Sequence, residues 1–174
     1  DCNKVLEYAL QTSDEGIYFS SDKKLDWDTM VVCTVTDASF CNENEYVKGV
    51  FEPGRSQQGY IVCLAQHNAA EAEEMIVHPI SWSSTVIKRV CRSTMMAETF
   101  AMIKGTEAGA KIRAAVVDMK GKLSMADWEG SSADVMGHVW MTDCDSLYEH
   151  LISTKHNSVD NKRLNVDLMA LRQL

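Results

Sequence analysis

The pattern of apolar and polar positions predicts three strands in the first half of the chain. Residues 31–36 form an unbroken run of β-branched and apolar side chains, which is typical of a strand buried on both faces. Residues 59–65 form a second apolar run, and residues 79–83 alternate between apolar and polar positions with a period of two. Because no helical pattern separates these runs, we expect an antiparallel meander.

The residues before this meander are expected to form an appendage to it. Residues 4–10 have a helical pattern, and residues 17–19 are expected to form a short strand after Gly16. We therefore divide the chain into an N-terminal segment at 1–28 and one globular domain at 29–174. The chain begins without Met, and we expect it to be an excised piece of a longer polypeptide.

The strongest helical pattern covers residues 94–113. Ser93 or Thr94 can cap the N-terminus, and Glu98 lies close to the first turn, where the helix dipole favours an anion. Small residues recur along one flank of this helix: Ala97, Ala101, Gly105, Ala108 and Gly109. Each glycine costs roughly 1 kcal/mol of helix stability relative to alanine, so we expect this flank to lie close against the sheet.

The second half of the chain predicts one more strand and two more helices. We interpret the polar residues 118–137 as a mobile connection, followed by a strand at 138–142 and a helix at 146–152. A last helix is expected at 160–174. Its apolar positions follow the spacing i, i+4, i+7 and are Leu164, Leu168 and Leu171.

The composition is that of one globular domain. The chain has 174 residues, of which 45% are hydrophobic, and two prolines. Its apolar runs are far shorter than the roughly 18 residues that a membrane-spanning helix needs. The six cysteines show no C-x-x-C spacing, so we expect reduced thiols of an intracellular protein rather than a zinc site or a disulfide framework.

The net charge of −8 disfavours binding to nucleic acid unless basic residues gather locally, because phosphate contacts depend on Lys and Arg. Lys88, Arg89 and Arg92 form such a cluster. These three residues are therefore the first candidates for phosphate contacts.

Four acidic residues occupy positions where the pattern does not lead us to expect a charged side chain. Asp37 and Asp143 follow apolar strands, Glu98 lies on the long helix, and Asp167 falls within the apolar stripe of the last helix. Each has an ordinary explanation when taken alone: a turn cap at Asp37, a solvated helix start at Glu98, or a salt bridge from Asp167 to a neighbouring arginine. All four in this order predict a cluster of carboxylates.

Clustered oxygen ligands favour hard cations such as Mg²⁺ or Mn²⁺. Two such ions, about 3.5 to 4 Å apart, can activate a water and stabilise the attacking and leaving oxygens of a phosphodiester. Without metal, four converging carboxylates repel one another and raise one another's pKa values. We therefore expect two divalent ions that stabilise the fold and enable phosphodiester hydrolysis.

Sequence blocks around these acids carry a family resemblance. The blocks are GRSQQGY at 54–60, ISWSS at 80–84, RSTMMAE at 92–98, DCDS at 143–146 and the helix at 162–172. They resemble the RxSxxGY, ISWxS, SSTxAE and DNxSA blocks and the final helix of ribonuclease H domains in copia-like (LTR) retrotransposon Pol polyproteins. Residues 4–19 resemble the segment that joins reverse transcriptase to ribonuclease H in that family.

The resemblance implies a ribonuclease H-like α/β fold. Its five-stranded mixed sheet would combine the three-strand antiparallel meander with parallel strands, flanked by helices. It also implies cleavage of the RNA strand of RNA–DNA hybrids during reverse transcription, beside the reverse transcriptase domain of the same polyprotein. Residues 1–28 would then connect the two domains, and the location would be a cytoplasmic particle or the nucleus.

The resemblance also implies roles for individual residues. Carried over by position, the catalytic ligands of two Mg²⁺ or Mn²⁺ ions are Asp37, Glu98, Asp143 and Asp167. The expected substrate contacts are Lys88, Arg89, Arg92 and Ser146. Ser146 matches the serine of the family block, which we expect to cap the following helix or to orient Asp143.

The chain departs from the family pattern at several positions. Cys144 replaces the usual Asn after the third acid, and Asn165 replaces the His that commonly precedes the last one. His156 lies in the preceding loop and is either an aid to proton transfer or product release, or a solvated loop residue. No fifth strand is evident between residues 150 and 160.

Two other functions fit the same fold. The first is a catalytically degenerate ribonuclease H-like domain that is retained as a structural or interaction module. The second is an enzyme that cleaves DNA or structured RNA instead of a hybrid. Acids at all four positions favour an enzyme over the degenerate module.

Overall fold

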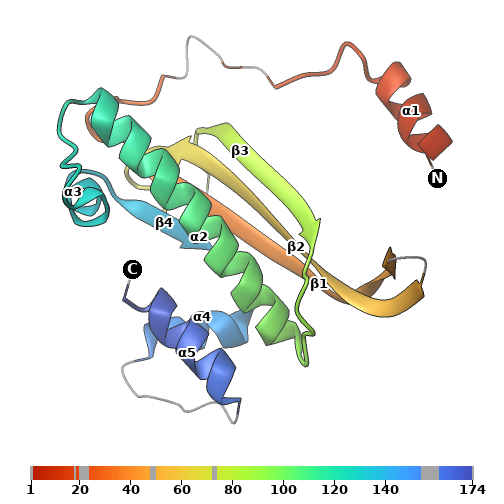
Figure 1. Ribbon diagram of the computed structural model, residues 1–174. Helices are drawn as coiled ribbons and strands as arrows, with labels where there is room; N and C mark the ends of the chain where they lie inside the picture. Colours follow the sequence, from red (N-terminus) through yellow and green to blue (C-terminus); the bar gives the residue numbers. More distant parts are fainter. Residues whose placement is uncertain are drawn as a thin grey trace.

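The computed structural model describes residues 2–17, 19, 24–47, 50–71, 74–153 and 161–173. Within these residues the chain forms a four-stranded sheet with the order β3-β2-β1-β4 (Figure 1). The strands are β1 (Val31–Val47), β2 (Val50–Ala65), β3 (Val77–Val86) and β4 (His138–Met141). β1 pairs antiparallel with β2, β2 pairs antiparallel with β3, and β4 runs parallel to β1. The expected mixed α/β sheet with a three-strand meander is therefore confirmed.

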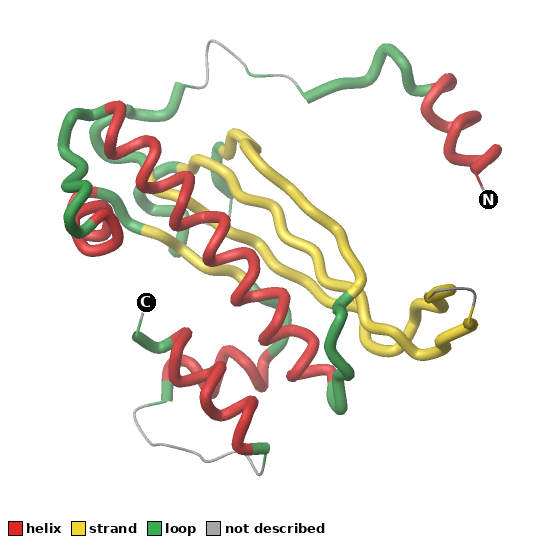
Figure 2. The backbone as a smooth tube through the Cα atoms, viewed as in Figure 1, coloured by secondary structure: helices red, strands yellow, loops and turns green. Residues whose placement is uncertain are grey.

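The fifth strand that the resemblance implies is not found in the described part of the chain. Residues 154–160, which include His156, lie outside that part. β1 and β2 instead extend past the other strands as a two-stranded ribbon (Figure 2), with shifts of register beyond Ser39.

β1 is an interior strand whose two faces differ. Val32 faces a core cluster that includes Val116 and Val117 of the long helix, and it is fully buried. Cys33 faces the opposite side and is also buried, but Val35 on that side is 42% exposed. The prediction of burial on both faces therefore holds only for the first part of the strand.

The long helix α2 (Thr94–Met119) covers one face of the sheet (Figure 1). Ser93 is its N-cap, because the Ser93 side chain accepts a hydrogen bond from the Met96 backbone N–H at 3.2 Å. A Cβ atom at Gly105 would lie 2.6 Å from Cγ2 of Thr36. Glycine is therefore what permits this close approach, and the predicted packing of the small-residue flank is confirmed.

The remaining helices are α1 (Cys2–Gln11), α3 (Trp128–Val135), α4 (Asp145–Ile152) and α5 (Lys162–Leu171). The interpretation of 118–137 as a mobile connection is wrong at residues 118–119, where α2 continues, and over α3. The Asp127 side chain caps α3 by accepting a hydrogen bond from the Gly130 N–H. Ile17 and Phe19 are not in a strand, contrary to expectation. None of the helices within the described ranges is long and apolar enough to cross a membrane.

Candidate metal centre

Three of the four predicted acids come together. One carboxylate oxygen from each of Asp37, Glu98 and Asp143 lies within 4.8 Å of the other two. The parallel register explains why the two aspartates meet: Val35 and Met141 are the last paired residues of β1 and β4, and each aspartate follows two residues later. Adjacent parallel strands end at the same edge of a sheet, so their next side chains meet there.

Glu98 is the buried member of this cluster. Its side chain is 3% exposed, which excludes the solvated helix start considered above. Oε1 accepts a hydrogen bond from the Ala38 backbone N–H at 3.2 Å. Oε2 is buried and has no hydrogen-bond partner among the described residues. Burying a carboxylate oxygen without a partner is costly, so Oε2 is the atom at this site that most needs a proton or a cation.

The electrostatics of the cluster centre on the same side chain. Burial raises the pKa of Glu98 to about 7, the Ala38 N–H opposes this rise, and the charges of Asp37 and Asp143 add to it. Asp37 and Asp143 are themselves exposed. The cluster is therefore buried on the side of Glu98 and exposed to solvent on the side of the two aspartates.

This donor set fits a hard divalent cation. All three donors are carboxylates, and Mg²⁺ typically binds one or two carboxylates while keeping several waters and phosphate oxygens as its other ligands. The exposed side of the cluster, at Asp37 and Asp143, leaves room for those ligands. The buried, unpartnered Oε2 adds a feature that exposed acidic residues alone do not provide.

Two threonines, whose role the sequence pattern did not predict, support the aspartates. The hydroxyl of Thr36 donates to the Met141 carbonyl at 3.5 Å and so joins β1 to β4 directly behind the cluster. The hydroxyl of Thr142 accepts from the Cys144 backbone N–H at 3.2 Å, across Asp143. A threonine precedes each aspartate in the sequence, and that repeat was the available signal.

Asp167 does not join the cluster. It lines a hollow together with Lys88, Arg89 and Lys104, on the flank of α2 turned away from Glu98. Its Oδ2 is buried and accepts no hydrogen bond within the described ranges. The predicted apolar stripe of α5 is confirmed, because Leu164, Leu168 and Leu171 are all buried in one cluster with residues of α2. That packing places Asp167 beside the stripe, on the side of the basic residues.

The predicted substrate contacts lie close to α2 and α4. Lys88, Arg89 and Arg92 are exposed in the loop that leads from β3 to α2. The guanidinium of Arg89 lies 5.3 Å from the centre of the Phe100 ring. All three cations are therefore available to a ligand beside the helix that carries Glu98.

Ser146 lies in the first turn of α4 and is exposed. The expectation that it caps this helix is wrong: the N-cap is Cys144, which makes no side-chain capping hydrogen bond. The Ser146 hydroxyl lies 3.3 Å from the Cys144 sulfur instead. A contact from Ser146 to substrate stays a prediction.

The chain was compared with models of protein families, with curated proteins and with solved structures. It matches none of them. What the site can do therefore has to be judged from its own geometry.

Proposed function

We propose that this chain is a metal-dependent endonuclease of the ribonuclease H type, which cleaves the RNA strand of RNA–DNA hybrids within a copia-like retrotransposon polyprotein. The observation that carries the proposal is the meeting within 4.8 Å of Asp37 from β1, Glu98 from α2 and Asp143 from the loop after β4. The mixed sheet order and the resemblance of the sequence blocks around these acids support it further.

Asp37, Glu98 and Asp143 would hold Mg²⁺ or Mn²⁺ at the edge of the sheet. When bound, such ions lower the pKa of a water and stabilise charge on the leaving oxygen. Glu98 has to give up its proton to act as a ligand, and its pKa of about 7 makes this possible near neutral pH. Asp167 remains the predicted fourth ligand, although it lies in a separate hollow.

The reaction is a hydrolysis. A water adds to phosphorus, the bond from phosphorus to the 3′-oxygen breaks, and the RNA is left with a 3′-hydroxyl and a 5′-phosphate. The exposed side of the cluster would receive the scissile phosphate, while Lys88, Arg89 and Arg92 would contact phosphates farther along the hybrid. Discrimination of the hybrid would depend on its shape and on 2′-hydroxyl contacts rather than on base edges.

An assay on three substrates tests this proposal. With Mg²⁺, we expect cleavage of an RNA–DNA hybrid and not of duplex DNA or duplex RNA. Asp37→Asn should lower the rate by at least about 100-fold, a loss typical of removing one electrostatic stabiliser of a transition state. Asp145→Asn is the matched control, because Asp145 is an exposed carboxylate at the start of α4 and lies outside the cluster.

Other results would point elsewhere. Cleavage of duplex DNA or duplex RNA alone would keep the chemistry and replace the substrate. If wild type cleaves none of the three substrates and is as inactive as Asp37→Asn at the same protein concentration, the chain is a non-catalytic module and the proposal fails.

A further inference from the structure

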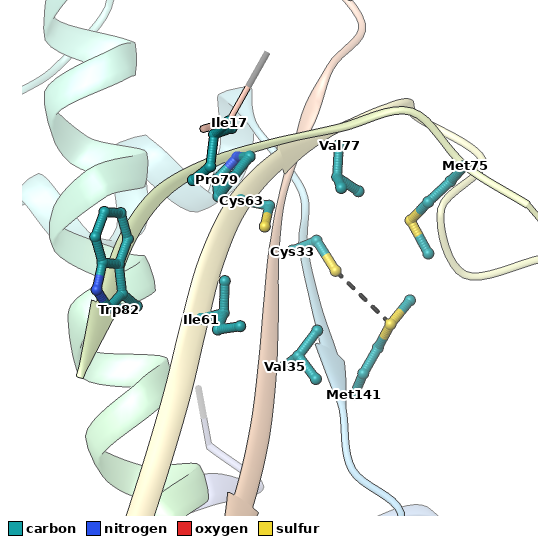
Figure 3. Close-up of a pocket in the computed structure, with 10 residues that line it drawn as sticks. All are labelled: Ile17, Cys33, Val35, Ile61, Cys63, Met75, Val77, Pro79, Trp82 and Met141. Atoms are coloured by element: carbon teal, nitrogen blue, oxygen red, sulfur yellow. Dashed lines mark hydrogen bonds between the residues drawn. The ribbon is translucent and has the colours of Figure 1, made fainter. Parts of the chain in front are cut away.

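The face of the sheet opposite α2 carries an exposed apolar hollow. It has a volume of about 410 Å³ and is lined by apolar side chains from all four strands (Figure 3). The most exposed of them are Val35 at 42%, Ile61 at 47%, Val77 at 41% and Trp82 at 65%. Cys33 lies against Met141 at its floor, and burial raises the Cys33 pKa to about 11, so this thiol stays uncharged. An exposed apolar surface of this kind typically marks a site that another apolar surface binds.

Helix α1 has an apolar side that packs on no other helix or strand in the described part of the chain (Figure 1). Its large apolar residues are Val5, Leu6, Tyr8 and Leu10, which are between 61% and 77% exposed. Its polar residues Lys4, Glu7 and Gln11 gather on the other side at helical spacing. A helix of 10 residues is only marginally stable alone in water, so α1 also needs a surface on which to pack.

The chain between α1 and the sheet already lies at this hollow. Ile17 is one of its lining residues (Figure 3), and the ring of Phe19 meets the ring of His78 on β3 edge-on at 5.3 Å. Only residues 12–16 separate the end of α1 from Ile17. Fully extended, that connection reaches about 20 Å. A tether this short gives an effective concentration in the millimolar range, so docking within one chain is favoured over docking between chains.

We propose that the apolar side of α1 packs into this hollow on its own sheet, with Leu6 against Ile61 and Trp82 and with Lys4 and Glu7 left in solvent. The docked helix would close the face of the sheet that α2 leaves open. This inference does not depend on the proposed nuclease activity.

Site-specific photo-crosslinking in the full chain tests the geometry. Benzoyl-phenylalanine in place of Leu6 should crosslink within the monomer to peptides that contain Ile61, Val77 or Trp82. The same probe in place of Glu7, which lies about 100° around α1 from Leu6 on the polar side of the helix, should give about tenfold less of these products. Products found only in dimers would assign the hollow to a second copy and overturn the proposal, as would crosslinks that avoid the sheet.

A variant in the sheet provides an independent readout at α1. Trp82→Ser should lower the hydrogen-exchange protection of the α1 amides by about tenfold, because it removes part of the surface on which the helix packs and leaves the helix sequence intact. Ile80→Ser is the matched control: Ile80 is 47% exposed on the same strand but does not line the hollow. Equal protection in wild type and both variants would show that α1 does not dock here.

Discussion

The backbone N–H of Ala38 donates a hydrogen bond to Oε1 of Glu98 at 3.2 Å, and this bond joins β1 to α2 behind the acidic cluster. It satisfies one carboxylate oxygen and leaves Oε2 buried without a partner among the described residues. This hydrogen bond holds the Glu98 side chain in place, while the negative charge that Glu98 carries when ionised has no compensating partner among the described residues.

Mn²⁺ should raise the melting temperature of the wild-type protein, because a cation that binds the folded state alone stabilises it by mass action. Asp143→Asn should remove most of this increase, since it deletes one of the three clustered carboxylates. Differential scanning calorimetry with and without Mn²⁺ measures both effects, with Asp145→Asn as the control. Equal increases in wild type and Asp143→Asn would show that the ion binds elsewhere.

Asp167→Asn should leave the Mn²⁺-dependent increase in melting temperature nearly unchanged in the free protein. The reason is that Asp167 lies in the hollow with Lys88 and Arg89 and outside the cluster. Calorimetry of Asp167→Asn and wild type, with and without Mn²⁺, measures the two increases. A loss as large as that of Asp143→Asn would mean that Asp167 reaches the cation, as the family resemblance implies.

In the metal-free protein, the contribution of Glu98 to the free energy of unfolding should fall as the pH rises from about 4.5 to about 7. The folded state keeps the Glu98 proton up to a pKa of about 7, whereas the unfolded chain releases it near 4.5. Folding therefore binds a proton in this window, and stability falls by up to about 3 kcal/mol as the proton is lost. Urea unfolding of wild type and Glu98→Gln in EDTA, at pH 5 and pH 8, measures the difference.

Glu98→Gln should be more stable relative to wild type at pH 8 than at pH 5. His138 acts in the opposite direction, because burial lowers its pKa to about 4 and its contribution is lost as the pH falls from 6.5. Comparing the two proteins at each pH cancels the His138 effect. If the difference between them does not change with pH, Glu98 is not the titrating group.

Gly105→Ala should destabilise the protein by about 1–2 kcal/mol, although alanine is the better helix former. The new Cβ would overlap Cγ2 of Thr36, and overpacking of this kind typically costs about 1–3 kcal/mol. Thermal or urea unfolding measures the loss. Adding Thr36→Ser, which removes the clashing methyl group, should restore part of it. If the two changes prove additive, Gly105 is not required for close packing.

The sheet and two of the acids could be predicted because their signals are local. An apolar run followed by Thr and Asp occurs twice, and the structure pairs those two runs as β1 and β4. The eight-residue helix α3 was missed because its sequence is polar and has little helical periodicity. Local pattern gave no reason to expect a helix there.

The position of Asp167 shows a different limit of sequence reasoning. The apolar stripe of α5 was predicted correctly, and Asp167 lies beside it. Periodicity places a residue on one side of a helix but does not fix which neighbour that side meets. Packing of Leu168 and Leu171 decided this, and it turned Asp167 toward Lys88 and Arg89.

The parallel pairing of β1 with β4 also determines when the site can form. Its two aspartates are supplied by segments more than 100 residues apart, which Thr36 links to the end of β4. Contacts of such long range are the slowest to form, because the intervening chain has to be ordered first. A nascent or partly folded chain therefore lacks the acidic cluster, and binding of a divalent ion to that cluster, if the proposal holds, would report completion of the fold.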